Sequence, residues 1–364
     1  MVSRPQAGPE QIVRLARPDV GEAELAEIRE VLESGQLTMG EKVAEFEGLL
    51  AAAAGTEHAV AVSSGTAALH VAVLALGIGS GDEVLVPAYT FPATANVVAL
   101  AGATPVLVDV DPETMNLDPV DTARRVTSRT KAILAVHLFG RPARLEELPE
   151  LPVLEDAAGA LGATRRGRAC GSLGALACFS FHPRKIVTTG EGGAVSTDDG
   201  GLAERARSLR HHGWSPSARY DDMPVPAFNY RLSDVLCALG LPQLRRLEEL
   251  HAAHERVAAG YAARLAGLDL VLPQADPGDR HGWQAYVIQV DRRDEVMEAL
   301  RAQGIQCQIG TYALHRLGAY RQQGPFPGAD AAYERALALP LHTGLTEGEL
   351  DRVGEALDKL VSHH

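Results

Sequence analysis

The chain has 364 residues, which is long enough for a large hydrophobic core and two structural domains. Hydrophobic residues make up 46% of the sequence and charged residues 22%, as is typical of a soluble globular protein. The formal net charge of −13 argues against nucleic acid or an anionic membrane as the main partner. A local patch of donors can still bind a small anion.

The sequence indicates neither a metal centre nor a membrane anchor. The four cysteines are too scattered for a zinc site or a CxxC redox pair, and we expect them to be reduced and buried. No apolar run reaches the length of a transmembrane helix, and the first residues lack the apolar core of a signal peptide. We therefore expect a cytoplasmic protein.

The first 200 residues alternate between helical and strand patterns. Residues 1–17 are expected to form a partly ordered arm, followed by two helices, Val20–Leu32 and Glu41–Ala54. The predicted strands are His58–Val62, Glu83–Pro87, Thr104–Val110, Ala132–His137, Val153–Glu155, Ala175–Phe181 and Gly193–Thr197. Between them lie the predicted helices Ala67–Leu76, Pro92–Ala101 and Val120–Val126. This order predicts an α/β fold with a mostly parallel central sheet and helices on both faces.

The pattern changes after Gly200. A basic helix, a loop at 213–228 and a long helical region precede a second series of strands and helices. The segments are Leu202–His211, Ser233–Leu265, Leu270–Leu272, Ala285–Val290, Arg293–Gln303 and Gln306–Ile309. We predict a large domain over residues 1–247 and a smaller C-terminal α/β domain over residues 248–364.

Polar and aromatic residues follow several predicted strands, where parallel sheets bind their ligands. The turn Ser63–Thr66 opens a helix, so its free amides and hydroxyls favour an anion, although simple N-capping explains the same residues equally well. Phe91 and Asp156 also follow strands. Lys185 lies in a loop rich in glycine between two predicted strands, which makes it a candidate for chemistry. Considered alone, however, a lysine is most often a solvated surface charge.

Taken together, these groups suit a ligand with an aldehyde, a basic ring nitrogen, a flat aromatic face and a phosphate. Pyridoxal 5′-phosphate is such a ligand. Lys185 would form the Schiff base, and Asp156 would keep a proton on the pyridine nitrogen. Phosphate donors would come from Ser64, Gly65, Thr66 and Ser180.

Six ordered motifs also resemble a known family. They read SSGTAAL, PAYTFPATAN, VHLFG, EDAAGALGA, SFHPRKIVTTGEGGAV and FNYRLSD. The chain resembles the DegT/DnrJ/EryC1/StrS sugar aminotransferases, which are fold-type-I pyridoxal-phosphate enzymes. This resemblance implies a homodimer with active sites at the interface, a nucleotide-linked keto-sugar as substrate and an L-amino acid as donor.

The resemblance assigns roles to individual positions. Lys185 matches the Schiff-base and proton-transfer lysine, and Asp156 matches the partner of the ring nitrogen. Phe91 matches the residue that stacks on the ring, and Asn229 matches an asparagine that reaches the phosphate in the neighbouring subunit. Gly65, Thr66 and Ser180 match phosphate contacts. Considered one by one, Asp156 could be a cap, Phe91 a core residue and Asn229 a turn former.

One position departs from the family pattern. A glutamine, histidine or glutamate is common three residues after the aspartate, near the phenolic oxygen of the cofactor, whereas this chain has Gly159. We expect the glycine to leave room for substrate or water. Tyr312 and His315 lie where the family places residues that face the substrate.

The predicted activity is transamination in two half-reactions, with pyridoxamine phosphate formed between them. The donor, glutamate or glutamine, would give its amino group to a keto-deoxysugar nucleotide, as in antibiotic or polysaccharide biosynthesis. Rival activities are an aminotransferase acting on a cyclitol ketone or forming an aminobenzoate precursor, and a sugar dehydratase, against which Lys185 counts. A non-catalytic pyridoxal-phosphate-binding regulator is disfavoured because the chain keeps Lys185, Asp156 and the phosphate loop.

Overall fold

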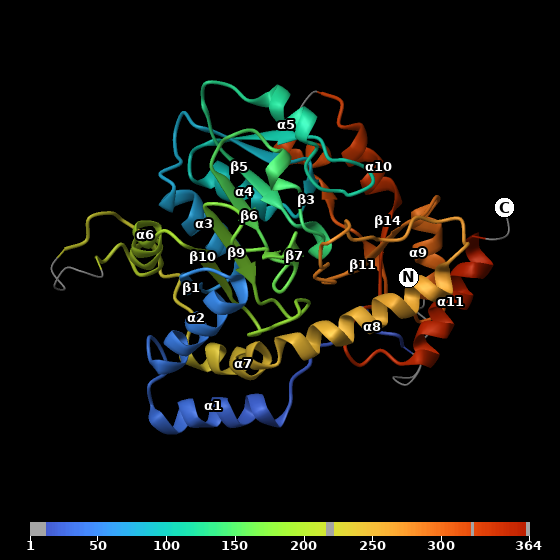
Figure 1. The fold of residues 1–364 in the computed structure, drawn as a ribbon, viewed down its shortest axis with the longest axis horizontal. Helices are drawn as coiled ribbons and strands as arrows, with labels where there is room; N and C mark the ends of the chain where they lie inside the picture. The colour runs from blue at the N-terminus through green and yellow to red at the C-terminus, as the bar shows by residue number, and fades with distance from the viewer. Residues whose placement is uncertain (1–11, 216–221, 322–323, 362–364) are drawn as a thin grey trace, which may run out of the picture.

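A seven-stranded sheet forms the centre of the computed structural model, which describes residues 12–215, 222–321 and 324–361 (Figure 1). The strand order is β1-β10-β9-β6-β5-β2-β4. The strands are β1 His58–Val62, β2 Glu83–Pro87, β4 Thr104–Val108, β5 Thr130–Val136, β6 Val153–Asp156, β9 Leu176–Ser180 and β10 Gly193–Thr197. Only β10 runs against its neighbours in this sheet, so the prediction of a mostly parallel sheet is confirmed.

Helices cover both faces of this sheet because alternate strand residues point to opposite sides. Val60 and Val62 of β1 belong to the core under α3, α4 and α6, whereas Ala59 and Ala61 belong to the core under α2 and α7. These helices are α2 Glu41–Ala54, α3 Gly65–Ala75, α4 Ala93–Leu100, α6 Gly200–Arg210 and α7 Asp234–Arg245. The short helix α5, Pro119–Arg125, packs beside β4.

The predicted helical region Ser233–Leu265 is two helices, α7 and α8 (Leu247–Leu265). The helix breaks at Arg246, whose φ and ψ are −111° and 25°. The Arg246 guanidinium donates to Asp19 Oδ1 at 2.8 Å and to Glu24 Oε1 at 3.0 Å. Through these bonds the break is tied to the start of α1 (Glu22–Ser34), which runs along α7 in Figure 1.

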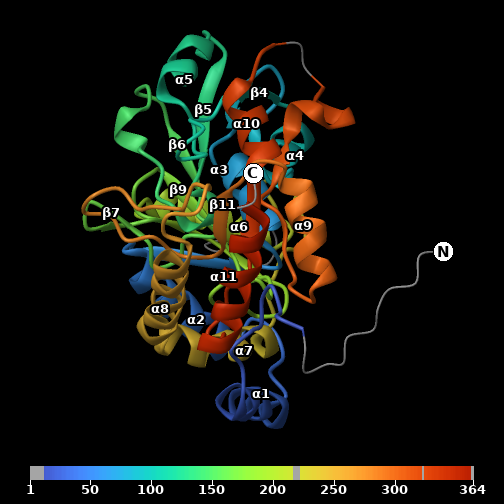
Figure 2. The same cartoon turned by 90° about the vertical axis from the view of Figure 1, so that its right-hand side faces the viewer.

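A second sheet lies at the far end of α8. It is antiparallel, in the order β11-β14-β12, and α8, α9 and α11 pack around it (Figure 2). The elements are β11 Tyr286–Gln289, β12 Gln308–Ile309, β14 Ala336–Leu339, α9 Arg293–Ala302 and α11 Glu347–Val361. The predicted strand Leu270–Leu272 is wrong, since only Val271 forms a bridge, to Gln289.

The predicted arm and loop are described in part. Residues 1–11 of the arm and 216–221 of the loop lie outside the described residues. Val13 is buried in the core around the second sheet and bridges to Ile305. The N-terminal segment therefore joins C-terminal elements before the chain reaches α1.

The C-terminal part also folds back onto the central sheet. Strand β13 (Tyr312–Ala313) pairs with β3 (Tyr89–Thr90), directly after β2. At the start of α10 (Pro327–Arg335), the amides of Gly328 and Ala329 donate to the Asp109 carboxylate at 3.0 and 2.8 Å. The other short elements are strands β7 Thr164–Arg165 and β8 Arg168–Ala169, and 3-10 turns Leu138–Gly140, Leu145–Glu147, Leu314–Arg316 and Gly318–Tyr320.

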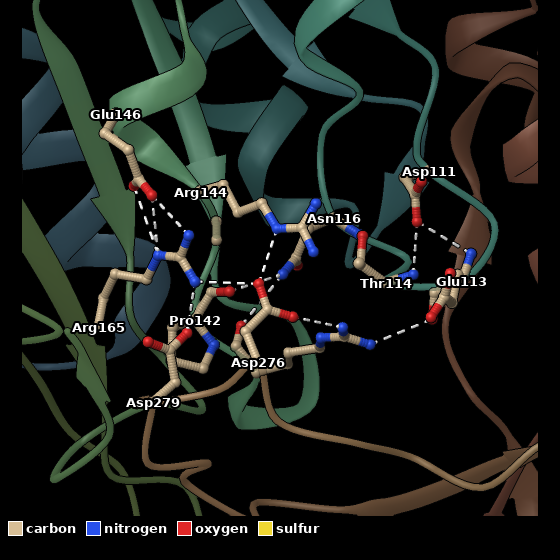
Figure 3. Close-up of polar contacts among 12 residues, drawn as sticks. Asp111, Glu113, Thr114, Asn116, Pro142, Arg144, Glu146, Arg165, Asp276 and Asp279 are labelled. Carbon is tan, nitrogen blue, oxygen red and sulfur yellow. Dashed lines mark hydrogen bonds and ion pairs between the residues drawn. The ribbon is translucent and has the colours of Figure 1, made fainter.

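An ion-pair cluster binds the segment before β11 to the central part of the chain (Figure 3). The Asp276 carboxylate accepts from Arg141 at 2.8 Å, from Arg144 at 2.7 Å and from Arg165 at 3.0 Å. The mostly buried Arg165 also pairs with Asp279 at 2.6 Å. Such a network fixes the path of the chain leading into the second sheet.

No helix in the described ranges combines the length and apolar character needed to cross a bilayer. The same ranges contain no cluster of three or more potential metal ligands. All four cysteines are buried and form no disulfide.

Candidate active site

Asp156, the loop of Lys185 and the turn before α3 lie at the carboxyl edge of the central sheet. Asp156 ends β6, and its neighbour β9 runs parallel to it into the loop that carries Lys185. The turn before α3 follows β1, which is parallel in direction to β9 because each is antiparallel to β10. Residues far apart in the sequence therefore share one edge, as expected for the carboxyl ends of parallel strands.

Asp156 is a buried carboxyl group. The residue is 6% exposed, and the backbone amide of Ala158 donates to its Oδ1 at 3.1 Å. Burial raises the pKa of Asp156, while the amide and the nearby charge of Lys185 act in the opposite direction. A cationic group beside it would favour the carboxylate form.

The loop holding Lys185 is fixed at both ends. The Lys185 amide donates to His182 O at 2.8 Å, and Thr188 Oγ1 donates to Phe181 O at 2.8 Å. Gln243 of α7 accepts from the amide of Thr188 and donates to its carbonyl, at 2.9 and 2.8 Å. The sequence analysis overlooked Gln243 because only the tertiary fold brings α7 to this loop.

Lys185 is poised between its charged and neutral forms. Desolvation lowers its pKa to about 8, with Asp156 opposing this shift and Arg184 adding to it. A neutral amine is both a nucleophile and a base, so this lysine can serve either role near neutral pH.

The turn before α3 has the features of a small anion site. Ser64 caps the helix by accepting from the Ala67 amide at 3.0 Å, and Thr66 is exposed. A methyl group built on Gly65 would lie 2.8 Å from Ser180 Cβ, so only glycine allows the helix start to lie so close to β9. The N-terminus of α3 and the hydroxyl group of Ser180 thus lie side by side.

Two aromatic side chains meet beside this edge. Phe91 follows β3 and is 60% exposed, so it is not the core residue that one alternative suggested. Its ring lies 6.2 Å from that of Tyr312, in an edge-to-face arrangement. The pairing of β3 with β13 produces this contact.

His315 has different surroundings. Its Nε2 lies 3.0 Å from Asp330 Oδ1, and its ring packs on Phe326 with 4.9 Å between centroids. These contacts belong to the packing of α10. Of the two residues that the resemblance places toward the substrate, Tyr312 is thus the one that contacts another predicted site residue.

Asn229 is exposed beside the turn that precedes α3. Its Oδ1 accepts from the Arg231 amide at 3.3 Å, and the neighbouring Tyr230 carbonyl accepts from the Ser63 amide at 2.8 Å. The FNYR motif therefore runs alongside the SSGT motif. The contribution of Asn229 to a second subunit stays a prediction.

The side-chain direction of Gly159 faces Gln284, and the expectation that the glycine leaves room for substrate or water stays a prediction. A methyl group built on Gly159 would lie 3.3 Å from both Cβ and Oε1 of Gln284. Gln284 directly precedes Ala285 and β11. Nothing in the local sequence indicates that this residue reaches the site.

A buried pair lies behind Asp156 that sequence reasoning also missed. His137 Nε2 is 2.8 Å from Glu155 Oε2, and the Ala143 amide donates to His137 Nδ1 at 2.9 Å. Burial alone would raise the pKa of Glu155. Hydrogen bonds from His137 and from the amides of Gly171 and Gly174 outweigh this effect and lower the pKa. This pair anchors the carboxyl ends of β5 and β6.

Comparisons with known proteins assign the chain to a family of sugar aminotransferases. The model of the DegT/DnrJ/EryC1/StrS aminotransferase family matches residues 18–358. Over 339 residues the chain is 42% identical to GDP-perosamine synthase of Caulobacter vibrioides, a match that covers 89% of this chain and 91% of that protein.

Solved structures share the whole fold. DesI, crystallised in the presence of its TDP-sugar product, matches with a TM-score of 0.91 and 35% identity, over 97% of this chain and 94% of its own. The PLP form of the sugar aminotransferase Spr1654 of Streptococcus pneumoniae matches with a TM-score of 0.90 and 29% identity, over 96% of this chain and 98% of its own.

Proposed function

The chain belongs to the DegT/DnrJ/EryC1/StrS aminotransferase family, and from this premise we propose that it transfers an amino group from an L-amino acid to a nucleotide-linked keto-deoxysugar. The observation that carries the proposal is the arrangement of Asp156 and Lys185 at neighbouring parallel strands, with Asp156 at the end of β6 and Lys185, whose pKa is about 8, in the loop after β9. Likeness to a GDP-perosamine synthase and to DesI supports the substrate class.

The residues present fit pyridoxal 5′-phosphate. The buried carboxyl of Asp156 suits a protonated ring nitrogen, because a cation beside it would offset the cost of burial. The close approach of Gly65 to Ser180 leaves a helix N-terminus and hydroxyl groups for a phosphate. When bound, this cofactor supplies an aldehyde that condenses with amines and a ring that accepts an electron pair.

The chain's own residues would then bind, orient and move protons. Neutral Lys185 would accept at Nζ the proton from the α-carbon of the donor and would then deliver it to the carbon that had been the aldehyde carbon of the cofactor. In the second half-reaction Lys185 would move a proton in the reverse sense, onto the carbon of the sugar that receives nitrogen. Asp156 would hold the ring-nitrogen proton throughout, and the exposed face of Phe91 would cover the ring.

We further propose a homodimer in which Asn229 serves the phosphate site of the partner. Apolar side chains are exposed on the segment leading to Asn229, where an interface would cover them. They include Met223, Val225 and Phe228, with exposures of 50%, 42% and 51%. We also propose a cytoplasmic location, in a pathway that makes amino sugars for an antibiotic or a polysaccharide.

A panel of nucleotide-linked keto-sugars tests this function. The purified protein, loaded with pyridoxal 5′-phosphate, is incubated with glutamate or glutamine and with GDP- or TDP-linked keto-sugars, and products are read by mass. We expect one carrier to give an amino sugar whose mass reflects replacement of the carbonyl oxygen by an amine. A cyclitol ketone serves as the competing substrate. Turnover of that ketone alone would overturn the assignment to nucleotide sugars.

A further inference from the structure

We propose that Gln284 is a positioning residue of this active site, whose side-chain amide takes the place of a side chain at position 159 and holds the Lys185 loop against the turn after Asp156. The inference rests on the proposed function for its consequence in catalysis. Its structural content stands on the contacts of Gln284 itself.

The first observation is that Gly159 and Gln284 compete for one space. A methyl group built on Gly159 would lie 3.3 Å from Gln284 Cβ and Oε1 and 3.4 Å from its Cγ, so a side chain at this position would fit only if Gln284 moved aside. Gly159 is not among the glycines with a left-handed backbone, so its backbone allows any residue. Occupation by Gln284, rather than strain, therefore explains the glycine.

The second observation is the direction of the amide. Its oxygen lies on the side of Gly159, three residues after Asp156, whereas its Nε2 donates to the carbonyl of Arg184 at 3.4 Å. That carbonyl directly precedes Lys185. The single side chain thus spans the turn after Asp156 and the loop of Lys185.

The third observation is that the Gln284 backbone is held firmly. Its amide donates to Phe139 O at 3.1 Å, and the amide of Gly282 donates to Gly140 O at 2.7 Å. Between them Trp283 has a φ of 43°, a strained conformation that these contacts maintain. The Asp276 ion pairs in Figure 3 fix the preceding segment.

These contacts assign a function to Gln284. The side chain excludes water from the space between the turn and the loop, and its amide restrains the carbonyl before Lys185. Desolvation is the largest cause of the lowered pKa of Lys185, so opening this space to water would raise that pKa. The residue would act through Lys185, without a direct part in the chemistry.

The test measures the titration of Lys185 in the full-length protein without cofactor. The sequence contains four lysines, so acetylation by limiting acetic anhydride, read by mass spectrometry across a pH series, resolves Lys185 from the others. We expect Gln284→Ala and the milder Gln284→Asn to raise the midpoint of Lys185 by about half a unit to one unit. Adding Gly159→Gln to Gln284→Ala should reverse at least half of this shift.

Gln289→Ala is the matched control. Gln289 Nε2 donates to the carbonyl of Pro112 at 3.0 Å, so this variant also removes a glutamine bond to the central part of the chain, at a place away from Lys185. We expect its Lys185 midpoint to equal that of the wild type. The single variant Gly159→Gln should melt at a lower temperature than the double variant, because two side chains then share one space.

The result that would overturn the inference is an unchanged midpoint in both Gln284 variants, or a double variant that titrates no closer to wild type than Gln284→Ala does. A wild-type protein that binds no pyridoxal 5′-phosphate would refute the proposed function instead. The two failures are distinct, because the acetylation series contains no cofactor.

Discussion

The ring of Tyr312 stands edge-on to that of Phe91, with 6.2 Å between centroids and 62° between planes. More than 200 residues separate the two in the sequence, and the pairing of β13 with β3 brings them together. The contact between the two rings beside the carboxyl edge of the sheet therefore forms only when the C-terminal part of the chain is in place. Gln284 also comes from the C-terminal part of the chain, so the site is complete only when that part has folded against the central sheet.

Lys185→Ala should abolish transamination while leaving the fold intact. The substitution removes the amine that would bind the cofactor aldehyde and move the proton, so we expect turnover to fall by a factor of about 10⁴ or more. Product formation from the best keto-sugar measures the loss. Lys131→Ala, at an exposed lysine that is the second residue of β5, is the control and should keep full activity. Near-native turnover by Lys185→Ala would exclude Lys185 as the proton carrier.

Asp156→Asn should slow proton abstraction without preventing cofactor binding. The amide keeps the shape of the side chain but lacks the charge that would keep the ring nitrogen protonated. Stopped-flow absorbance of the half-reaction with glutamate should show a rate reduced by about 10²-fold or more, with the cofactor still bound after gel filtration. A wild-type rate would show that Asp156 is not the ring partner.

The pKa of Lys185 should respond to its charged neighbours with opposite signs. Asp156 raises this pKa and Arg184 lowers it, so Asp156→Asn should lower the acetylation midpoint and Arg184→Gln should raise it. In the wild type, the glutamate half-reaction should accelerate as the pH rises through about 8, because the neutral amine is the base. Shifts of equal sign in the two variants would contradict this electrostatic account.

The depressed pKa of Lys185 also has a consequence for stability. Between the folded pKa of about 8 and its ordinary value of 10.5, the unfolded chain binds more protons at this residue. Lys185 therefore lowers the free energy of unfolding by its full amount below about pH 8, and this destabilisation decreases as the pH rises from about 8 to 10.5. We expect Lys185→Met to raise the melting temperature at pH 7 more than at pH 10. An equal gain at both pH values would show that Lys185 is not desolvated.

Asp276→Asn should destabilise the protein through the ion-pair cluster. Hydrogen bonds from Arg144 and then Arg141 hold the pKa of Asp276 well below its usual range, so this stabilisation is present at neutral pH and is lost as the pH falls through the acid range. We expect a loss of about 1–3 kcal/mol in the free energy of unfolding at pH 7, measured by urea denaturation, and a smaller difference at low pH. Asp291→Asn, at an exposed partner of Arg335, should have little effect.

Mixing Lys185→Ala with Asn229→Asp should restore part of the activity lost in each. If Asn229 serves the opposite subunit, a mixed dimer holds one site with both defects and one with neither. Unfolding and refolding the two variants together would give half mixed dimers, and so about a quarter of wild-type activity. Verified mixed dimers without recovery would mean that Asn229 acts within its own chain.

Strand and helix order could be predicted for the first 200 residues because each strand there is short and apolar and each connection is local. The position of Asp156 and Lys185 at strand ends followed from that order, since parallel strands place their carboxyl ends together. The last hundred residues were predicted less well. The segment around Val271 carries a strand-like pattern yet forms one bridge. Strand β14 was not predicted, although the two strands that pair with it, β11 and β12, were.

By itself, the sequence determined the chemistry available to this protein: the lysine, the aspartate, the hydroxyl-rich helix start and the family to which they belong. The tertiary structure alone decided what surrounds them. Gln243 and Gln284, which the sequence analysis did not name, reach the site from α7 and from the segment before β11, over distances that no periodicity encodes. Tyr312 was named from the family resemblance, and only the pairing of β13 with β3 supplies its contact with Phe91. A local pattern records which face of an element is buried, whereas the partner across that face depends on how the whole chain packs.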